Sequence, residues 1–88
     1  MSNVRIIGIN VSNRSEVAEK VQKVLTNYGC SIRTRLGLNE ADEIHYGSGG
    51  LIILELTGDE KEWEQMMKYL SEIDDIQVKF MDFERNIF

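Results

Sequence analysis

The sequence predicts an α+β domain in which two helices cover one face of a four-stranded antiparallel sheet. Its apolar segments follow the order strand, helix, strand, strand, helix, strand. Two interleaved right-handed βαβ crossovers then place the first and third strands in the middle of the sheet. This βαββαβ sandwich is the ferredoxin-like arrangement, and a chain of 88 residues is long enough for one such domain.

The first strand is expected at residues 4–11, VRIIGINV, because a nearly continuous apolar run is typical of a strand covered on both faces. Asn13 stands where it can cap a following helix, and Glu16 completes a capping box three residues later. Gly29 is expected to end this helix in a left-handed conformation. The apolar stripe of the helix comprises Val17, Ala18, Val21, Val24, Leu25 and Tyr28.

The second half of the chain continues the pattern after a long connection. A strand at 30–38 is followed by 39–49, which is rich in acidic residues and glycine and is predicted to be a mobile loop. The third strand is expected at 51–57, with Asp59 and Glu62 in capping-box register before the second helix. The buried stripe of that helix comprises Trp63, Met66, Met67, Leu70 and Ile73.

A last strand at 76–83 completes the fold, so we expect one domain over residues 1–88, with its core at 4–83 and a short tail at 84–88. Hydrophobic residues make up 42% of the chain and charged residues 28%, a mixture typical of a soluble globular domain. No apolar run approaches the roughly 20 residues that span a bilayer, and the N-terminus lacks the apolar region of a signal peptide. We therefore expect a cytoplasmic protein without a membrane partner.

The charge balance argues against nucleic acid as a partner. Ten Lys and Arg against fifteen Asp and Glu give a net charge of −5, the wrong sign for a phosphate backbone. RNA-binding domains of the same topology stack bases on strand aromatics, and the predicted central strands, VRIIGINV and LIILEL, contain no aromatic residue. We therefore expect no direct binding of nucleic acid.

The predicted sheet leaves apolar side chains on the face away from the helices. Side chains alternate along a strand, so only half of the aliphatic residues can face the helices. The residues expected to face the helices are Ile7, Ile9, Ile52, Leu54 and Leu56, and those expected to face away are Val4, Ile6, Leu51 and Ile53. Exposed apolar faces usually mark association surfaces. We therefore expect a homodimer or homotetramer whose interface contains the second set together with Glu55.

Arg33 and Arg35 are expected at the margin of this same face, where Glu55 is the acid that would pair with them. Gly37 leaves a gap beside the two arginines. Guanidinium groups bind carboxylates and phosphates in a planar, bidentate way, so the pair could hold an anionic effector between subunits. The alternative is that their charge keeps an edge strand from pairing with other sheets.

A second candidate anion site lies where the first strand meets the first helix. Arg14, with Ser12 and Asn13, stands beside a helix N-terminus, whose free amides and dipole favour negative charge. Ordinary helix capping would explain Ser12 and Asn13 without a ligand. Gly8, in a central strand, either lets a backbone or ligand approach closely or relieves crowding at an interface.

The sequence predicts neither a metal site nor a cofactor. The groups with ligand atoms that stand together are His45, Glu40, Asp42 and Glu43, but their spacing matches no standard metal motif and is typical of a solvated acidic loop. Cys30 is the single cysteine and cannot form an internal disulfide. Because it follows the C-terminal end of a helix, a small core residue is favoured over a nucleophile.

Four segments carry a resemblance to known proteins: RIIGINVSNR, EVAEKVQKVLTNYG, RLGL and LIILELTGD. Across about residues 5–80 the chain resembles the iron-only hydrogenase system regulators, which are similar to ACT domains and to the C-terminal domain of nickel-responsive repressors. The family commonly has Gly-Arg-Met-Gly, then an apolar residue and proline. Here Thr34 replaces the first glycine and Asn39 replaces the proline. The chain also lacks the family's glycine-rich segment in the second helix.

The resemblance implies a small regulatory module with an ACT-like fold, which senses a ligand, works as a dimer or tetramer and is not an enzyme. The residues that we expect to contact a small-molecule or anionic effector are Asn13, Arg14, Arg33, Arg35 and Gly37. One alternative is a purely structural oligomerisation domain. Another is an acylphosphatase-like hydrolase of the same topology, for which Arg14 is roughly positioned, although the glycine-rich loop with phenylalanine before the arginine is missing.

Overall fold

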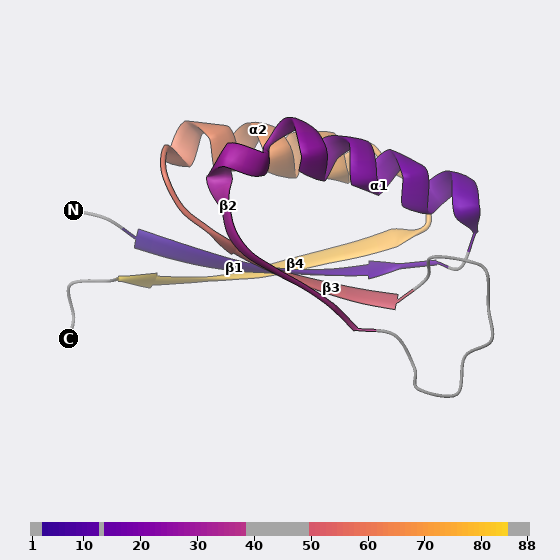
Figure 1. Cartoon of the computed structure of the whole chain (residues 1–88), viewed down its shortest axis with the longest axis horizontal. Helices are drawn as coiled ribbons and strands as arrows, with labels where there is room; N and C mark the ends of the chain where they lie inside the picture. The colour runs from indigo at the N-terminus through magenta and orange to yellow at the C-terminus, as the bar shows by residue number, and fades with distance from the viewer. Residues whose placement is uncertain (1–2, 13, 39–49, 85–88) are drawn as a thin grey trace.

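The computed structural model describes residues 3–12, 14–38 and 50–84, and its elements have the predicted order (Figure 1). The strands are hydrogen-bonded in the order β2-β3-β1-β4, every neighbouring pair is antiparallel, and both helices lie on one side of the sheet. The elements are β1 (Asn3–Val11), α1 (Ser15–Asn27), the 3₁₀ helix η1 (Gly29–Ser31), β2 (Ile32–Leu38), β3 (Gly50–Leu56), α2 (Glu60–Ser71) and β4 (Ile76–Glu84). The predicted ferredoxin-like fold, with β1 and β3 in the middle, is confirmed.

The ends of the described chain bear on two predictions. β4 continues to Glu84, one residue beyond the predicted end of the core. The loop predicted at 39–49 and the remainder of the predicted tail, 85–88, lie outside the described residues. Among the helices of the described ranges, none is long and apolar enough to cross a membrane.

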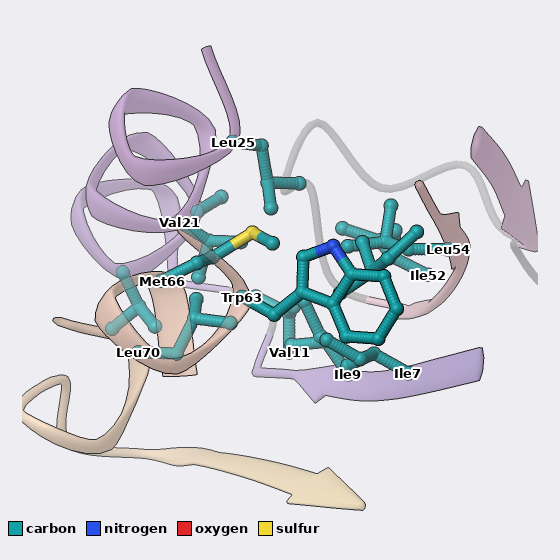
Figure 2. Close-up of a cluster of buried hydrophobic side chains, with 13 residues drawn as sticks. Ile7, Ile9, Val11, Val21, Leu25, Ile52, Leu54, Trp63, Met66 and Leu70 are labelled. Atoms are coloured by element: carbon teal, nitrogen blue, oxygen red, sulfur yellow. The ribbon is translucent and has the colours of Figure 1, made fainter. Parts of the chain in front are cut away.

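The core lies between the two helices and the sheet, chiefly its central strands. Trp63 is only 1% exposed, and its indole Nε1 donates a hydrogen bond to the carbonyl of Thr57 at 2.8 Å. Figure 2 shows labelled side chains of both helices and of β1 and β3 gathered around this indole. The buried apolar residues are Ile7, Ile9, Val11, Val17, Ala18, Val21, Leu25, Ile52, Leu54, Leu56, Trp63, Met66 and Leu70. The predicted stripes therefore form the core, with Val24, Tyr28, Met67 and Ile73 partly buried at its edge.

The two helices begin differently. α2 has the predicted cap, because the Asp59 side chain accepts a hydrogen bond from Lys61 N at 2.9 Å. The cap predicted for α1 is wrong: the N-cap is Arg14, whose side chain makes no capping hydrogen bond, and Asn13 lies outside the described residues. Arg14 instead forms ion pairs with neighbouring carboxylates, so electrostatic contacts rather than a capping oxygen hold the chain where it enters α1.

The chain after α1 also differs from the prediction. Tyr28 is the C-cap with φ of −109°, and Gly29 opens η1 without a left-handed conformation. Ser31 fills the core position at the end of η1, since it is buried and its carbonyl accepts a hydrogen bond from Thr57 N at 2.8 Å. Cys30 is therefore exposed, and the prediction that it is a small core residue is wrong.

Candidate functional site

The outer face of the sheet, which is the face opposite the helices, carries exposed apolar side chains. The register sets Gly8 between Ile53 on β3 and Lys79 on β4, and alternate residues share this face. By this alternation the face includes Val4, Ile6, Gly8 and Asn10 of β1, Leu51, Ile53 and Glu55 of β3, Thr34 and Leu36 of β2, and Gln77, Lys79, Met81 and Phe83 of β4. Its most exposed apolar side chains are Leu36 at 52%, Leu51 at 37%, Met81 at 58% and Phe83 at 49%.

The outer face is larger than the sequence predicts. The register gives Val4, Ile6, Leu51, Ile53 and Glu55 the orientation that was expected of them. Sequence reasoning missed the contributions of Met81 and Phe83, although they stand at alternate positions of β4 opposite Ile6 and Val4. The alternation of the last strand was the signal that could have identified them.

Arg35 lies on the opposite side of the sheet from its predicted position. It pairs with Leu54, whose side chain is fully buried beneath the helices. The Arg35 guanidinium Nη2 donates a hydrogen bond to Gln22 Oε1 on α1. The expectation that Arg35 frames the outer face is therefore wrong, and this arginine belongs to the edge of the helix layer.

A β-bulge explains the reversal. The register between β2 and β3 shifts between Ile32 and Thr34, so one extra residue, Arg33, enters β2. An added residue exchanges the faces of everything beyond it. Ile32 accordingly packs against the core, whereas Leu36 is exposed opposite Ile53, although regular alternation would point residues 32 and 36 the same way.

Glu55 was expected to pair with the two arginines across the outer face. Its Oε1 accepts a hydrogen bond from Thr34 Oγ1 at 2.9 Å on that face. Arg35 cannot share the face with Glu55, because Arg35 pairs with Leu54, the neighbouring residue of opposite orientation. Arg33 is exposed at the bulge. The structure therefore separates Arg33 and Arg35, which the sequence pattern predicts to lie together.

Arg14 is held by two carboxylates of its own chain. Its Nε donates to Glu16 Oε1 at 2.9 Å, and its Nη1 donates to Asp75 Oδ2 at 2.8 Å. The hydrogen bond to Glu16 is the main reason that the pKa of Arg14 is raised and the pKa of Glu16 is lowered. An anion at this position would compete with both carboxylates for the guanidinium group.

A pocket of about 330 Å³ lies beside Arg14, where β1 ends and β4 begins. Ser12 Oγ in its wall is buried and has no hydrogen-bond partner among the described residues. Gln77 Oε1 in the same wall accepts a hydrogen bond from Asn10 Nδ2 at 3.2 Å. Because Arg14 is tied to the start of β4 and Arg35 extends from β2, the two predicted ligand residues lie toward opposite edges of the sheet.

Sequence reasoning missed a charged cluster around Arg5. Arg5 is only 8% exposed on the helix-facing side of β1, and its Nε and Nη2 donate to the two carboxylate oxygens of Asp82 at 2.6 and 3.0 Å. Nη1 donates to Glu64 on α2 at 3.0 Å. The guanidinium carbon also lies 4.2 Å from the centre of the Phe80 ring and 5.7 Å from that of Trp63.

The Arg5 cluster links β1, β4 and α2 at one end of the sheet. The hydrogen bond that Arg5 donates to Asp82 is the largest cause that raises the pKa of Arg5, and the same bond holds the pKa of Asp82 below its usual range. Arg5 shares the orientation of Ile7 and lies directly opposite Asp82 in the register. An arginine at a core-facing position of an apolar strand was the signal that could have revealed this cluster.

The helix side of the molecule carries a groove of about 350 Å³ between α1 and α2. Tyr28 and Tyr69 line it with their ring centres 6.1 Å apart, and the Tyr28 hydroxyl donates to Gln65 Oε1 at 3.3 Å. Partial desolvation is the main cause that raises the pKa of Tyr28. The other residues that line the groove are Lys23, Val24, Asn27 and Glu62.

In the part of the chain that the structure describes, no three His, Cys, Asp or Glu side chains are grouped so that they could hold a metal ion. The acidic group considered in the sequence, His45 with Glu40, Asp42 and Glu43, lies outside the described residues. Asn13, one of the predicted ligand residues, also lies outside them. Gly37 is described, and a Cβ added there would meet no heavy atom of the described chain within 4 Å.

The sequence matches one protein family over most of its length. The model of the TM1266-like family, described as "Iron-only hydrogenase system regulator, putative", matches residues 3–80. A comparison with curated proteins gives no match.

Solved structures of similar shape agree on the fold. Protein TM1266 of Thermotoga maritima is similar with a TM-score of 0.80 and 21% identity, over 96% of this chain and 100% of that one. The regulatory subunit of aspartate kinase from Thermus flavus has a TM-score of 0.53 and 17% sequence identity, over 91% of this chain and 51% of that one. The ACT domain of GTP pyrophosphokinase from Chlorobium tepidum has a TM-score of 0.53 and 17% sequence identity, over 91% of this chain and 95% of that one. At these identities the likeness shows an ACT-like fold.

Proposed function

Because the chain belongs to the TM1266-like family of iron-only hydrogenase system regulators, we propose that it is a non-enzymatic module that senses a small molecule and works as a homo-oligomer. The structural neighbours support a regulatory role, since they include a regulatory subunit of aspartate kinase and the ACT domain of a GTP pyrophosphokinase. We place this activity in the cytoplasm.

The observation that carries the proposal is the apolar outer face. In a monomer the exposed Leu36, Met81 and Phe83 would remain in water, and each would forgo part of the roughly 1.5–3 kcal/mol that burial of such a side chain contributes. Because a domain of this size has a small core, burial of these side chains in an interface would be a large addition to its stability. The proposed interface contains Val4, Ile6, Leu51, Ile53 and Glu55 together with these three residues.

The effector is proposed to be a small molecule with an anionic group. The predicted contacts, Asn13, Arg14, Arg33, Arg35 and Gly37, do not converge within one subunit, so we propose Arg35 and Gly37 as the contacts of this molecule. Arg35 supports the proposal, because its guanidinium group lies beside α1, and Gly37, two residues further along β2, leaves the same side of the sheet without a side chain. Such a ligand regulates only if it binds one assembly state more tightly than another.

Native mass spectrometry of the purified protein tests the proposal, because it measures the mass of the assembly and of any small molecule retained in it. We expect a dimer or a tetramer. A monomer without any retained molecule would contradict the proposal. An assembly that retains nothing and gives no heat when titrated with amino acids and small anions would instead favour a purely structural oligomerisation domain.

Substitution of Arg35 tests the effector site. We expect Arg35→Ala to weaken effector binding about tenfold or more, because a charge-assisted, bidentate contact is lost. Lys20→Ala is the matched control, since it removes one exposed cation of α1 that lies outside the proposed site. Titration calorimetry with the retained molecule measures both variants, and equal affinities for Arg35→Ala and wild type would exclude Arg35 from the site.

A further inference from the structure

We infer that Gly8, at the centre of the outer face, is where a second copy of this chain makes its closest approach, with an apolar side chain of each copy seated over the glycine of the other. The inference rests on the proposed function, because it takes the outer face as the assembly surface. Glycine in the interior of a strand weakens the strand, since it loses more conformational freedom on folding and packs no side chain. A glycine in the central strand β1 therefore needs a physical reason.

The described chain itself gives no reason for glycine at this position. Gly8 is paired with Ile53 on one side and with Lys79 on the other, and neither register is interrupted by a bulge. Its backbone is not in the left-handed region that favours glycine. A Cβ added at Gly8 would meet no heavy atom of the described residues within 4 Å. The remaining reason for a strand glycine is a close approach from outside the chain.

The position of Gly8 suits such an approach. On the outer face it is flanked by Ile6 and Asn10 along β1 and by Ile53 and Lys79 on the neighbouring strands. Because these neighbours carry side chains and Gly8 does not, the centre of the face is lower than its surroundings. Packed sheets interdigitate large side chains with small ones, so this gap can receive an apolar side chain of a facing sheet.

The charges of the outer face favour a second copy as the occupant. Glu55 and Lys79 lie on this face on opposite sides of β1, on β3 and β4 respectively. A two-fold axis that runs parallel to the strands between β1 and β3, at the centre of the sheet, brings Ile53 of each copy over Gly8 of the other. Each Glu55 then lies diagonally opposite Lys79 of the other copy, one strand across and one pair of residues along, about 8 Å apart in the plane of the sheets. The face is thus complementary to itself.

Gly8→Ala and Gly8→Val test the inference by sedimentation. We expect Gly8→Val to weaken association about tenfold or more, because the added side chain occupies the gap, and Gly8→Ala to weaken it less. Under conditions where the chain is monomeric, the unfolding midpoint of both variants should equal or exceed that of wild type, since both residues suit a strand better than glycine. Gly29→Ala, another position where a Cβ meets no described atom within 4 Å, is the control and should associate like wild type.

The outcomes separate this inference from the proposed function. If wild type assembles, Ile53→Asp does not, and Gly8→Val assembles unchanged, the approach at Gly8 is wrong while the interface on the outer face stands. A wild type that is monomeric throughout would overturn both.

A charge exchange tests the two-fold arrangement. Lys79→Glu should weaken association, because it places like charges near each other across the axis. Adding Glu55→Lys to Lys79→Glu should restore association toward the wild-type level, since the exchanged charges again meet with opposite sign. A double variant that associates no better than the Lys79→Glu single variant would overturn the pairing of Glu55 with Lys79.

Discussion

The two faces of the sheet differ in what covers them. On the helix face, Ile7, Ile9 and Leu54 are fully buried beneath α1 and α2. On the outer face, Leu36, Met81 and Phe83 are about half exposed, although they are as apolar as the core residues. The same strands supply both sets by alternation. The comparison separates two roles of an apolar residue: on the helix face it stabilises the folded chain, and on the outer face its proposed role is association.

The largest effect is expected from the helix face. Trp63→Ala should lower the free energy of unfolding by about 3–5 kcal/mol, because a fully buried aromatic is removed and the Thr57 carbonyl loses its donor. For a small domain whose total stability is about 5 kcal/mol, this approaches unfolding. Urea denaturation followed by circular dichroism measures this change in the free energy of unfolding. A cooperative transition close to that of wild type would mean that Trp63 does not support the core.

A smaller effect is expected at the rim of the helix face, where Arg5 meets Asp82. Asp82→Asn should lower the free energy of unfolding by about 1 kcal/mol at pH 7, because a charge-assisted pair is lost from a half-exposed carboxylate. The pKa of Asp82 is lowered in the folded state by its hydrogen bond to Arg5. The stabilisation is therefore fully present above the unfolded pKa of about 3.9 and is lost as the pH falls through the lower folded value.

Urea denaturation of wild type and Asp82→Asn at pH 7 and near pH 2.5 checks this pH dependence. We expect the two proteins to differ at pH 7 and to converge at the lower pH. Glu60→Gln is a control that changes an exposed carboxylate without touching Arg5. A difference between wild type and Asp82→Asn that is equal at both pH values would contradict an ionic contribution from this pair.

The smallest effect on folding is expected from the outer face. Met81→Lys, made in the Ile53→Asp background so that association does not contribute, should change the free energy of unfolding by less than about 0.5 kcal/mol. Met81 is 58% exposed, so its replacement removes little buried area. Thermal denaturation at a fixed concentration measures the change. A loss of several kcal/mol would show that the outer face stabilises the single chain and would remove the contrast between the faces.

The fold was predictable because its signals are local and periodic. The apolar stripe of α2 and the Asp59 cap specify that helix, and the order of six segments leaves few topologies open. Alternation along β1 and β3 also identified correctly which aliphatic residues are buried.

The candidate site was less predictable, because one backbone irregularity determines which face of the sheet the side chains of β2 occupy. The bulge near Arg33 moves Arg35 to the helix side, and no turn residue or glycine within that segment signals the added residue. The Arg5 cluster depends on Asp82, which is distant in the sequence and comes opposite Arg5 only through the register of β1 and β4. Cys30 illustrates the same limit, since the 3₁₀ turn of η1 buries Ser31 in its place.

The most direct test of the outer face as an assembly surface is sedimentation velocity of wild type and Ile53→Asp over a series of micromolar concentrations. Ile53 lies in the middle of the outer face on a central strand, so a carboxylate there would be desolvated without a partner on association. We predict that wild type sediments as a dimer or tetramer and that Ile53→Asp sediments as a folded monomer with an unchanged circular dichroism spectrum. A wild type that remains monomeric, or an Ile53→Asp variant that assembles like wild type, would contradict the account.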